Sequence, residues 1–83
     1  MVKHTYLVGP RPIYPENPNA RFDGCVIVAA ESEHETEPAK ECAQRKSPAL
    51  AAHVRAGKRL SAAVIPNIKV PNFIKRGAVD LRS

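Results

Sequence analysis

The stretch that most constrains the fold is Cys25–Ala30, the only sustained apolar run of the chain that is rich in β-branched residues. A run of this kind predicts a strand that is buried on at least one face. We place this strand at Phe22–Ala30. An acidic turn follows it, and then alanine-bearing, helix-forming sequence up to Gln44. Residues 22–44 therefore predict a strand, a turn and a short helix, and the other segments are expected to pack around this unit.

The length of 83 residues suits one small domain, of a size that buries roughly 60% of its unfolded surface. Aromatic residues make up only 5% of the chain, so Val, Ile, Leu and Ala must form the core. Because Ala contributes little burial energy, we expect this core to be small. Eight prolines indicate extended connecting segments. We divide the single domain 1–83 into an α/β core at 1–64 and an extended basic segment at 65–83.

Two further strands are predicted, one on each side of this unit. Val2–Val8 alternates loosely between apolar and polar residues and forms the first strand. A proline-punctuated loop over residues 9–20 joins it to the next strand, which favours an antiparallel pair with a protruding loop. Leu60–Ile65 predicts a third strand. The alternative for this last segment is an extension of the preceding helix through Gly57.

Two short helices are predicted between the second and third strands. We place Thr36 at the N-cap of the first helix, which runs to about Lys46. The second helix is predicted at Pro48–Ala56, because Ser47 is a favourable N-cap and proline at the first helical position has no amide to satisfy. Gly57 can end this helix in the left-handed conformation.

The C-terminal segment contains two Pro-Asn pairs, at residues 66–67 and 71–72. Prolines at this spacing argue against a helix, so we expect an extended, edge-type segment with bulges or turns at the prolines. The last residues, 76–83, are expected to form a short helix or a loose tail. The whole pattern predicts a small two-layer α+β domain of two to three mostly antiparallel strands, two short helices and an extended basic C-terminal segment.

Charge is distributed unevenly along the chain, whose formal net charge is +5. Residues 24–44 carry five glutamates against one lysine, whereas residues 45–83 carry nine cations against one aspartate. A basic half beside an acidic turn indicates a protein or ribonucleoprotein complex with an acidic surface as partner, and it leaves nucleic acid possible. A solvated surface is the alternative. The acidic turn itself is interpreted as a solvated loop, with an acidic contact surface as its alternative.

The candidate partner-binding residues combine two aromatic anchors with clustered cations. Tyr14 lies in the proline loop and Phe73 in the C-terminal segment. A docking surface needs a few such anchors and complementary charge. Phe73 is the only aromatic residue interleaved with the cations, which argues against a stacking platform for single-stranded nucleic acid. The cationic candidates are Arg55, Lys58, Arg59, Lys69, Lys75 and Arg76.

The sequence contains no pattern for catalysis or metal binding. Cys25 falls in the buried strand, where an apolar setting makes a thiol inert, and no spacing ties Cys25 or Cys42 to a histidine. Potential ligands lack the close pairs that zinc sites show. We therefore expect no enzyme, no cofactor and no metal. The chain start lacks a signal-peptide core and no run approaches the roughly 20 apolar residues of a membrane span, so a cytoplasmic protein without membrane contact is expected.

A motif in the first half of the chain consists of Thr5-Tyr6-Leu7-Val8, then Pro10-Arg11, and then Arg21-Phe22 with a strand leading into an alanine-bearing helix. Over about the first 45 residues, this arrangement resembles small phage-encoded anti-CRISPR inhibitors, particularly of the type I-E kind. The resemblance implies a compact, non-enzymatic α/β protein of the host cytoplasm. It would bind a CRISPR surveillance complex and block its access to DNA or its recruitment of a nuclease.

A second, shorter motif consists of Ile65-Pro66, Lys69-Val70-Pro71, Phe73 and Gly77. It is similar to the segment that returns from the DNA-binding arm in bacterial HU-type proteins, whose N-terminal helical hairpin is missing here. Our first functional hypothesis is a non-enzymatic inhibitor of phage type that docks on a larger host complex. The alternatives are a structural subunit of a ribonucleoprotein or virion assembly and a small nucleic-acid-binding accessory protein.

Overall fold

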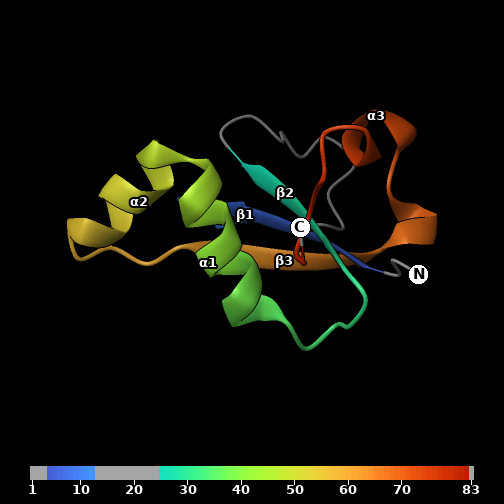
Figure 1. The fold of residues 1–83 in the computed structure, drawn as a ribbon, viewed down its shortest axis with the longest axis horizontal. Helices are drawn as coiled ribbons and strands as arrows, with labels where there is room; N and C mark the ends of the chain where they lie inside the picture. Colours follow the sequence, from blue (N-terminus) through green and yellow to red (C-terminus); the bar gives the residue numbers. More distant parts are fainter. Residues whose placement is uncertain (1–3, 13–24, 83) are drawn as a thin grey trace.

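The computed structural model describes residues 4–12 and 25–82, which contain a four-stranded sheet in the order β3-β1-β2-β4 (Figure 1). The central strand β1 pairs antiparallel with β2 and with β3, and β2 pairs parallel with β4. Since β2 and β3 both oppose β1, the strands β2, β3 and β4 share one direction. The strands are β1 (His4–Gly9), β2 (Val26–Ala30), β3 (Ser61–Pro66) and β4 (Val79–Asp80).

Strand β1 is the centre of the protein because both of its faces are covered. Tyr6 and Val8 pack against the larger core, which includes Val28 of β2. Leu7 points to the opposite face and belongs to a smaller core. This division follows from the alternation of side chains along a strand. The strand residues after His4 are therefore buried whichever way they point.

Two helices cover the first face of the sheet. Helix α1 (Thr36–Lys46) lays Ala39, Cys42 and Ala43 on the sheet, and small residues on this side let the helix approach closely. Helix α2 (Pro48–Arg55) packs on α1 and adds Leu50 to the same core (Figure 1). Both helices occur where the sequence predicts them.

The ends of the helices confirm most of the predicted caps. Ser47 Oγ accepts the Leu50 N–H at 3.3 Å and caps α2. Gly57 has a φ of +84°, the left-handed conformation that ends α2 and separates it from β3. The strand prediction for residues 60–65 is thereby confirmed over the helical extension. The prediction of Thr36 as N-cap is wrong by one residue, because Glu35 takes that position.

The C-terminal segment returns across the second face of the sheet and is not extended. It forms a 3-10 turn, η1 (Asn67–Lys69), and a short helix, α3 (Asn72–Lys75), before β4. Val70 and Ile74 are buried against Leu7 on this face. The connection from β2 to β3 and the connection from β3 to β4 therefore cross in opposite directions on opposite faces. Because both the direction and the face are reversed, the two crossover connections have the same handedness. Crossover connections between parallel strands strongly prefer one hand.

The two prolines explain why the expectation of an extended segment is wrong. Pro66 and Pro71 are the N-caps of η1 and α3, with φ near −60° and extended ψ. An N-cap residue needs no helical conformation and no intrahelical amide bond, so proline there is compatible with a helix that begins one residue later.

The predicted fold class is confirmed as a small α+β domain with short helices. The sheet has one strand more than predicted, since Val79–Asp80 is a strand where a helix or loose tail is expected. This strand is parallel to its neighbour β2. Residues 22–24 and 2–3, at the starts of two predicted strands, lie outside the described residues.

Candidate interaction surface

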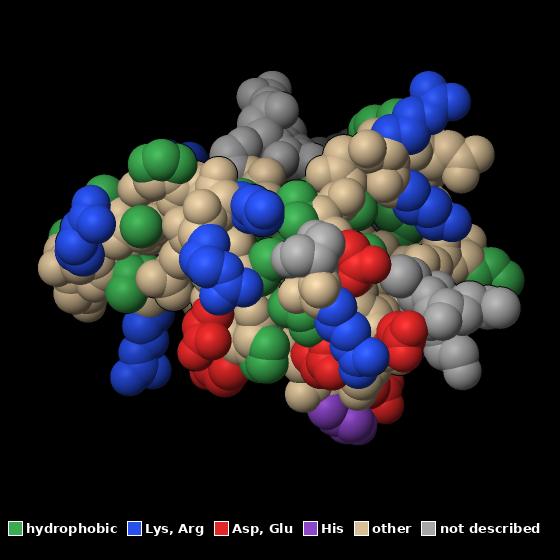
Figure 2. All heavy atoms as spheres, in the orientation of Figure 1, with side chains coloured by type: hydrophobic (Ala, Val, Ile, Leu, Met, Phe, Trp, Pro, Cys, Tyr) green, Lys and Arg blue, Asp and Glu red, His purple; other side chains and the backbone are tan. Residues whose placement is uncertain are grey.

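The structure divides the predicted cations into two groups at opposite ends of β3 (Figure 1). The six residues of β3 separate these groups by about 20 Å at the rise of an extended strand. Figure 2 shows Lys and Arg side chains at both ends of one face and also between them, so they do not form one continuous basic surface there. The α2 group consists of Arg55, Lys58 and Arg59, and the α3 group consists of Lys69, Lys75 and Arg76; all six are exposed.

The α3 group surrounds two exposed apolar side chains. Ile68 is 91% exposed and Phe73 is 70% exposed, the two largest values among the exposed large hydrophobic residues described. The sequence predicts Phe73 as an anchor but misses Ile68. We call the five residues together the η1–α3 surface: Ile68, Lys69, Phe73, Lys75 and Arg76.

The near-repeat in the sequence gives a signal that identifies Ile68. Residues 66–70 and 71–75 each begin with Pro-Asn, and each places a large apolar residue third. In the structure each proline caps a short helical turn, and the third residue, Ile68 or Phe73, points to solvent. The repeat therefore presents two apolar side chains in equivalent positions on successive turns.

The η1–α3 surface is anchored to the sheet from below. Thr5 of β1, 1% exposed, donates a hydrogen bond from Oγ1 to Asn67 Oδ1 at the start of η1. Val70 and Ile74 pack on Leu7 in the same face. A hydrogen bond at one end and apolar packing at the other hold the two turns in place, which reduces the conformational entropy that binding would remove.

The α2 group lies beside a shallow groove. Lys58 and Arg59 form one wall of this groove, which has a volume of about 390 Å³ and contains Val54 and Leu60 as its apolar part. His53 Nε2 lies 3.2 Å from the Arg59 carbonyl oxygen and ties the end of α2 to this wall. The other wall belongs to α1 and carries both signs of charge: Glu37, Lys40, Glu41 and Gln44. The groove is therefore mixed in charge, unlike the η1–α3 surface.

The acidic turn between β2 and α1 is held by a buried tyrosine. Tyr6 is fully buried, and its hydroxyl donates to the Ser32 carbonyl oxygen and accepts the Glu35 N–H at 2.9 Å. The Ser32 hydroxyl in turn accepts the His34 N–H at 3.0 Å. These bonds make the turn an ordered part of the fold.

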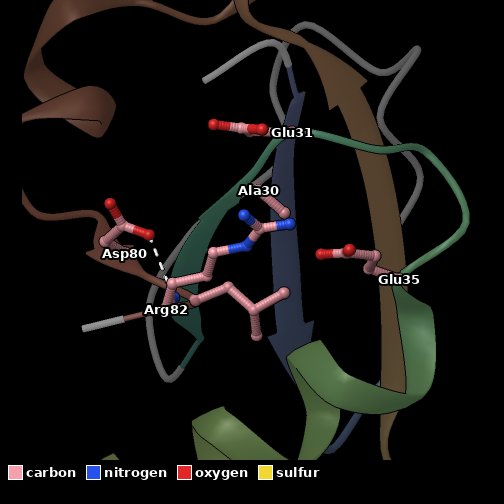
Figure 3. Close-up of a pocket in the computed structure, with 6 residues that line it drawn as sticks. Ala30, Glu31, Glu35, Asp80 and Arg82 are labelled. Carbon is pink, nitrogen blue, oxygen red and sulfur yellow. Dashed lines mark hydrogen bonds between the residues drawn. The ribbon is translucent and has the colours of Figure 1, made fainter. Parts of the chain in front are cut away.

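Arg82 lies over this turn from the C-terminal end of the described chain. A pocket of about 60 Å³ is lined by Glu31, Glu35, Asp80 and Arg82, among others, and Figure 3 shows the Arg82 guanidinium between Glu31 and Glu35. Asp80 Oδ1 accepts the Arg82 N–H at 3.0 Å, which fixes the backbone there. The acidic turn thus faces a cation of its own chain, a pairing that no pattern in the sequence predicts.

The two cysteines of the described chain differ in burial, since Cys42 is buried and Cys25 is half-buried. Cys42 is 1% exposed and belongs to the core beneath α1. Cys25 lies against Gly9, where an added Cβ would stand 2.9 Å from its sulfur. Within residues 4–12 and 25–82, no group of three His, Cys, Asp or Glu side chains is placed to hold a metal ion. The predicted anchor Tyr14 lies outside the described residues.

The motifs that carry the two family resemblances occupy different positions, the first mainly in the core and the second partly on the surface. Thr5–Val8, the core of the first motif, is buried in β1. The second motif, Ile65–Gly77, forms two capped helical turns instead of a returning arm. The buried segment Thr5–Val8 determines packing and locates no binding site, whereas the second motif contributes the exposed Lys69 and Phe73 to the η1–α3 surface.

None of the described helices is long and apolar enough to cross a membrane. Comparison of the chain with protein-family models, with curated proteins and with solved structures finds no match.

Proposed function

We propose that this chain is a non-catalytic binding protein that docks on a larger protein or ribonucleoprotein complex through the η1–α3 surface. The observation that carries the proposal is the exposure of Ile68 and Phe73 at equivalent positions within a cluster of cations. Exposed apolar side chains that gather in one patch rimmed by polar residues mark interaction sites. Aromatic anchors with neighbouring Lys and Arg side chains are typical of residues that dominate binding energy.

The charge of this surface determines the kind of partner. Lys69, Lys75 and Arg76 favour an acidic rim around the apolar contact, which accelerates association and selects against basic surfaces. Phe73 is the one aromatic side chain of the surface, and stacking on single-stranded nucleic acid uses aromatics in series. An acidic protein surface with apolar pockets therefore fits better than a nucleic acid.

A narrower form of the proposal is an inhibitor of phage type, as the anti-CRISPR resemblance implies. Such an inhibitor acts by occupying a site on a larger machine and needs only shape, anchors and complementary charge. A small domain with one anchored apolar-basic surface meets these requirements. The target and the consequence of docking remain part of the proposal.

The test is quantitative capture of partners from native host cells by tagged wild-type and variant protein. Phe73→Ser and the pair Lys75→Glu with Arg76→Glu are expected to lower recovery of the partner by about tenfold or more. The pair Arg45→Glu with Lys46→Glu is the matched control, since it also reverses two adjacent exposed cations at the end of a helix. This control pair should leave recovery unchanged.

Two results would contradict the proposal. One is a partner that all variants retain equally. The other is a partner that is lost on nuclease treatment and that binds wild-type protein and Phe73→Ser with the same steep dependence on salt. Such behaviour is typical of phosphate contacts.

A further inference from the structure

The two edges of the sheet are built differently. At one edge, β4 is two residues long and contains Asp80. At the other, β3 is six residues long and contains no charged residue. Proteins usually protect sheet edges with short strands, charges, bulges or prolines, because an open edge pairs with other strands. The β4 edge has this protection, whereas in the part of the chain that the structure describes the β3 edge has only Pro66 at its end.

The outer edge of β3 offers backbone groups for pairing. Over the described residues, β3 pairs with β1 along its whole length and is the last strand of the sheet on that side. In an antiparallel pair, alternate residues direct their N–H and C=O groups away from the partner strand. Val64, near the middle of β3, is 38% exposed, so an added strand also meets an apolar side chain there.

Cations bracket this edge on both sides. Lys58 and Arg59 come just before β3, Lys69 follows it, and all three are exposed. The residues between them, 60–68, carry no charge. We propose that the outer edge of β3 binds an extended segment of a protein partner that is uncharged in its centre and acidic beyond each end. The mode is strand addition, in which main-chain hydrogen bonds supply affinity and flanking side chains supply specificity.

The groove at the start of β3 gives the added strand a place for a side chain. It contains Val54 and Leu60, and its two walls differ in charge. The α1 wall carries Glu37 and Glu41 as well as Lys40, whereas the opposite wall carries only the cations Lys58 and Arg59, so an acidic residue of the incoming segment is attracted to the opposite wall. This arrangement makes the position of the acidic residue, as well as its sign, part of the recognition.

A second copy of this chain fits the edge poorly. Antiparallel pairing of two β3 strands about a twofold axis brings residues before the strand in one copy opposite residues after it in the other. Lys58 and Arg59 would then face Lys69 of the partner copy, and like charges directly opposite destabilise a pair of strands. The bracketing cations therefore favour an acidic segment from a different protein.

The test uses isotopically labelled full-length protein, NMR titration and synthetic peptides. The probe peptide has an alternating Thr-Val centre with Glu-Glu at each end, and the control peptide has the same centre with Lys-Lys at each end. The expected result is amide shifts concentrated on Ser61–Pro66 with the acidic peptide and about tenfold weaker binding of the basic one. Equal binding of both peptides, or shifts that avoid β3, would overturn the proposal.

A second pair of peptides separates strand pairing from simple charge attraction. N-methylation at alternate residues of the centre removes the N–H groups on one edge only, without changing charge. Methylation of one alternate set of peptide residues should weaken binding about tenfold or more, and methylation of the other set should not, because only one edge of the peptide strand faces β3. Similar binding by the two N-methylated peptides would exclude strand addition.

Protein variants distinguish this proposal from the one for the η1–α3 surface. Val64→Lys places a charge on the exposed edge and should abolish the peptide-induced shifts, whereas Phe73→Ser should leave them unchanged. Sedimentation of the wild-type protein without peptide should show a monomer. A dimer that Val64→Lys dissociates would assign the edge to a second copy and overturn the choice of partner.

Discussion

The two faces of the sheet use their apolar residues in different ways. On the α1 face, nine of the described residues are buried in one core, and Val54 of α2 packs partly buried against it. On the η1–α3 face, the apolar cluster has three buried members among the described residues, and the same short segment exposes Ile68 and Phe73. The first face therefore supports the fold, while the second leaves apolar area available for contact. The following predictions, in order of expected effect, test this difference.

Core truncations should have larger effects on the α1 face than on the other. Leu50→Ala removes a 2% exposed side chain from the larger core and should lower the free energy of unfolding by about 2–5 kcal/mol, a large part of the stability of a small domain. Ile74→Ala should cost less and mainly loosen α3. Urea denaturation followed by circular dichroism measures both, and equal losses would contradict the division between the faces.

Two hydroxyl deletions compare the faces through hydrogen bonds. Tyr6→Phe leaves the Ser32 carbonyl and the Glu35 N–H without their partner and should cost about 1–3 kcal/mol. Thr5→Val removes only the bond to Asn67, so its cost should be smaller and appear as faster amide exchange in η1 and α3. Hydrogen exchange by NMR checks both variants. If Thr5→Val accelerated amide exchange throughout the protein, the second face would contribute to the stability of the whole fold as the first face does.

Charge reversal on the η1–α3 face should change binding and not stability. Lys69→Glu, Lys75→Glu and Arg76→Glu together are expected to weaken partner binding more than about tenfold, because they replace attraction by repulsion at an acidic rim. The free energy of unfolding should change by no more than about 0.5 kcal/mol, as for most exposed substitutions. An unchanged affinity with a folded variant would remove these cations from the interaction.

Helix caps offer the smallest of these tests. Ser47 caps α2 with its side chain, whereas α3 begins after Pro71 without a side-chain cap. Ser47→Ala should lower the free energy of unfolding by about 1 kcal/mol. Its effect on partner binding should be negligible, because α2 belongs to the supporting face. Thermal unfolding and the capture assay together check the two expectations.

Local chemistry accounts for the parts of the fold that the sequence predicts well. The β-branched run becomes β2, the segment around Pro48 becomes α2 with Ser47 as its cap, and Gly57 takes the left-handed conformation. These features depend on propensities and hydrogen bonds within a few residues. The same locality explains why Phe73 is recognised as an anchor candidate from its neighbours in the chain.

Other features depend on contacts between distant segments. Val79–Asp80 becomes a strand only because β2 offers a free edge at that place, and its two residues give no strand pattern on their own. The Pro-Asn units become helical turns because Leu7 and Thr5, more than sixty residues away, hold Val70 and Asn67. Interactions across such separations leave no periodic signal in the local sequence.

Local patterns in the chain specify β1, β2, β3, α1 and α2, together with the total charge and the two Pro-Asn units. How these elements and charges are arranged in space depends on the folded chain. Strand β3, running between the two basic groups, separates cations that are close in the sequence, and the return over the second face turns Ile68 and Phe73 outward. The physical reason is that sheet order is set by long-range pairing and burial, which only the folded chain brings together.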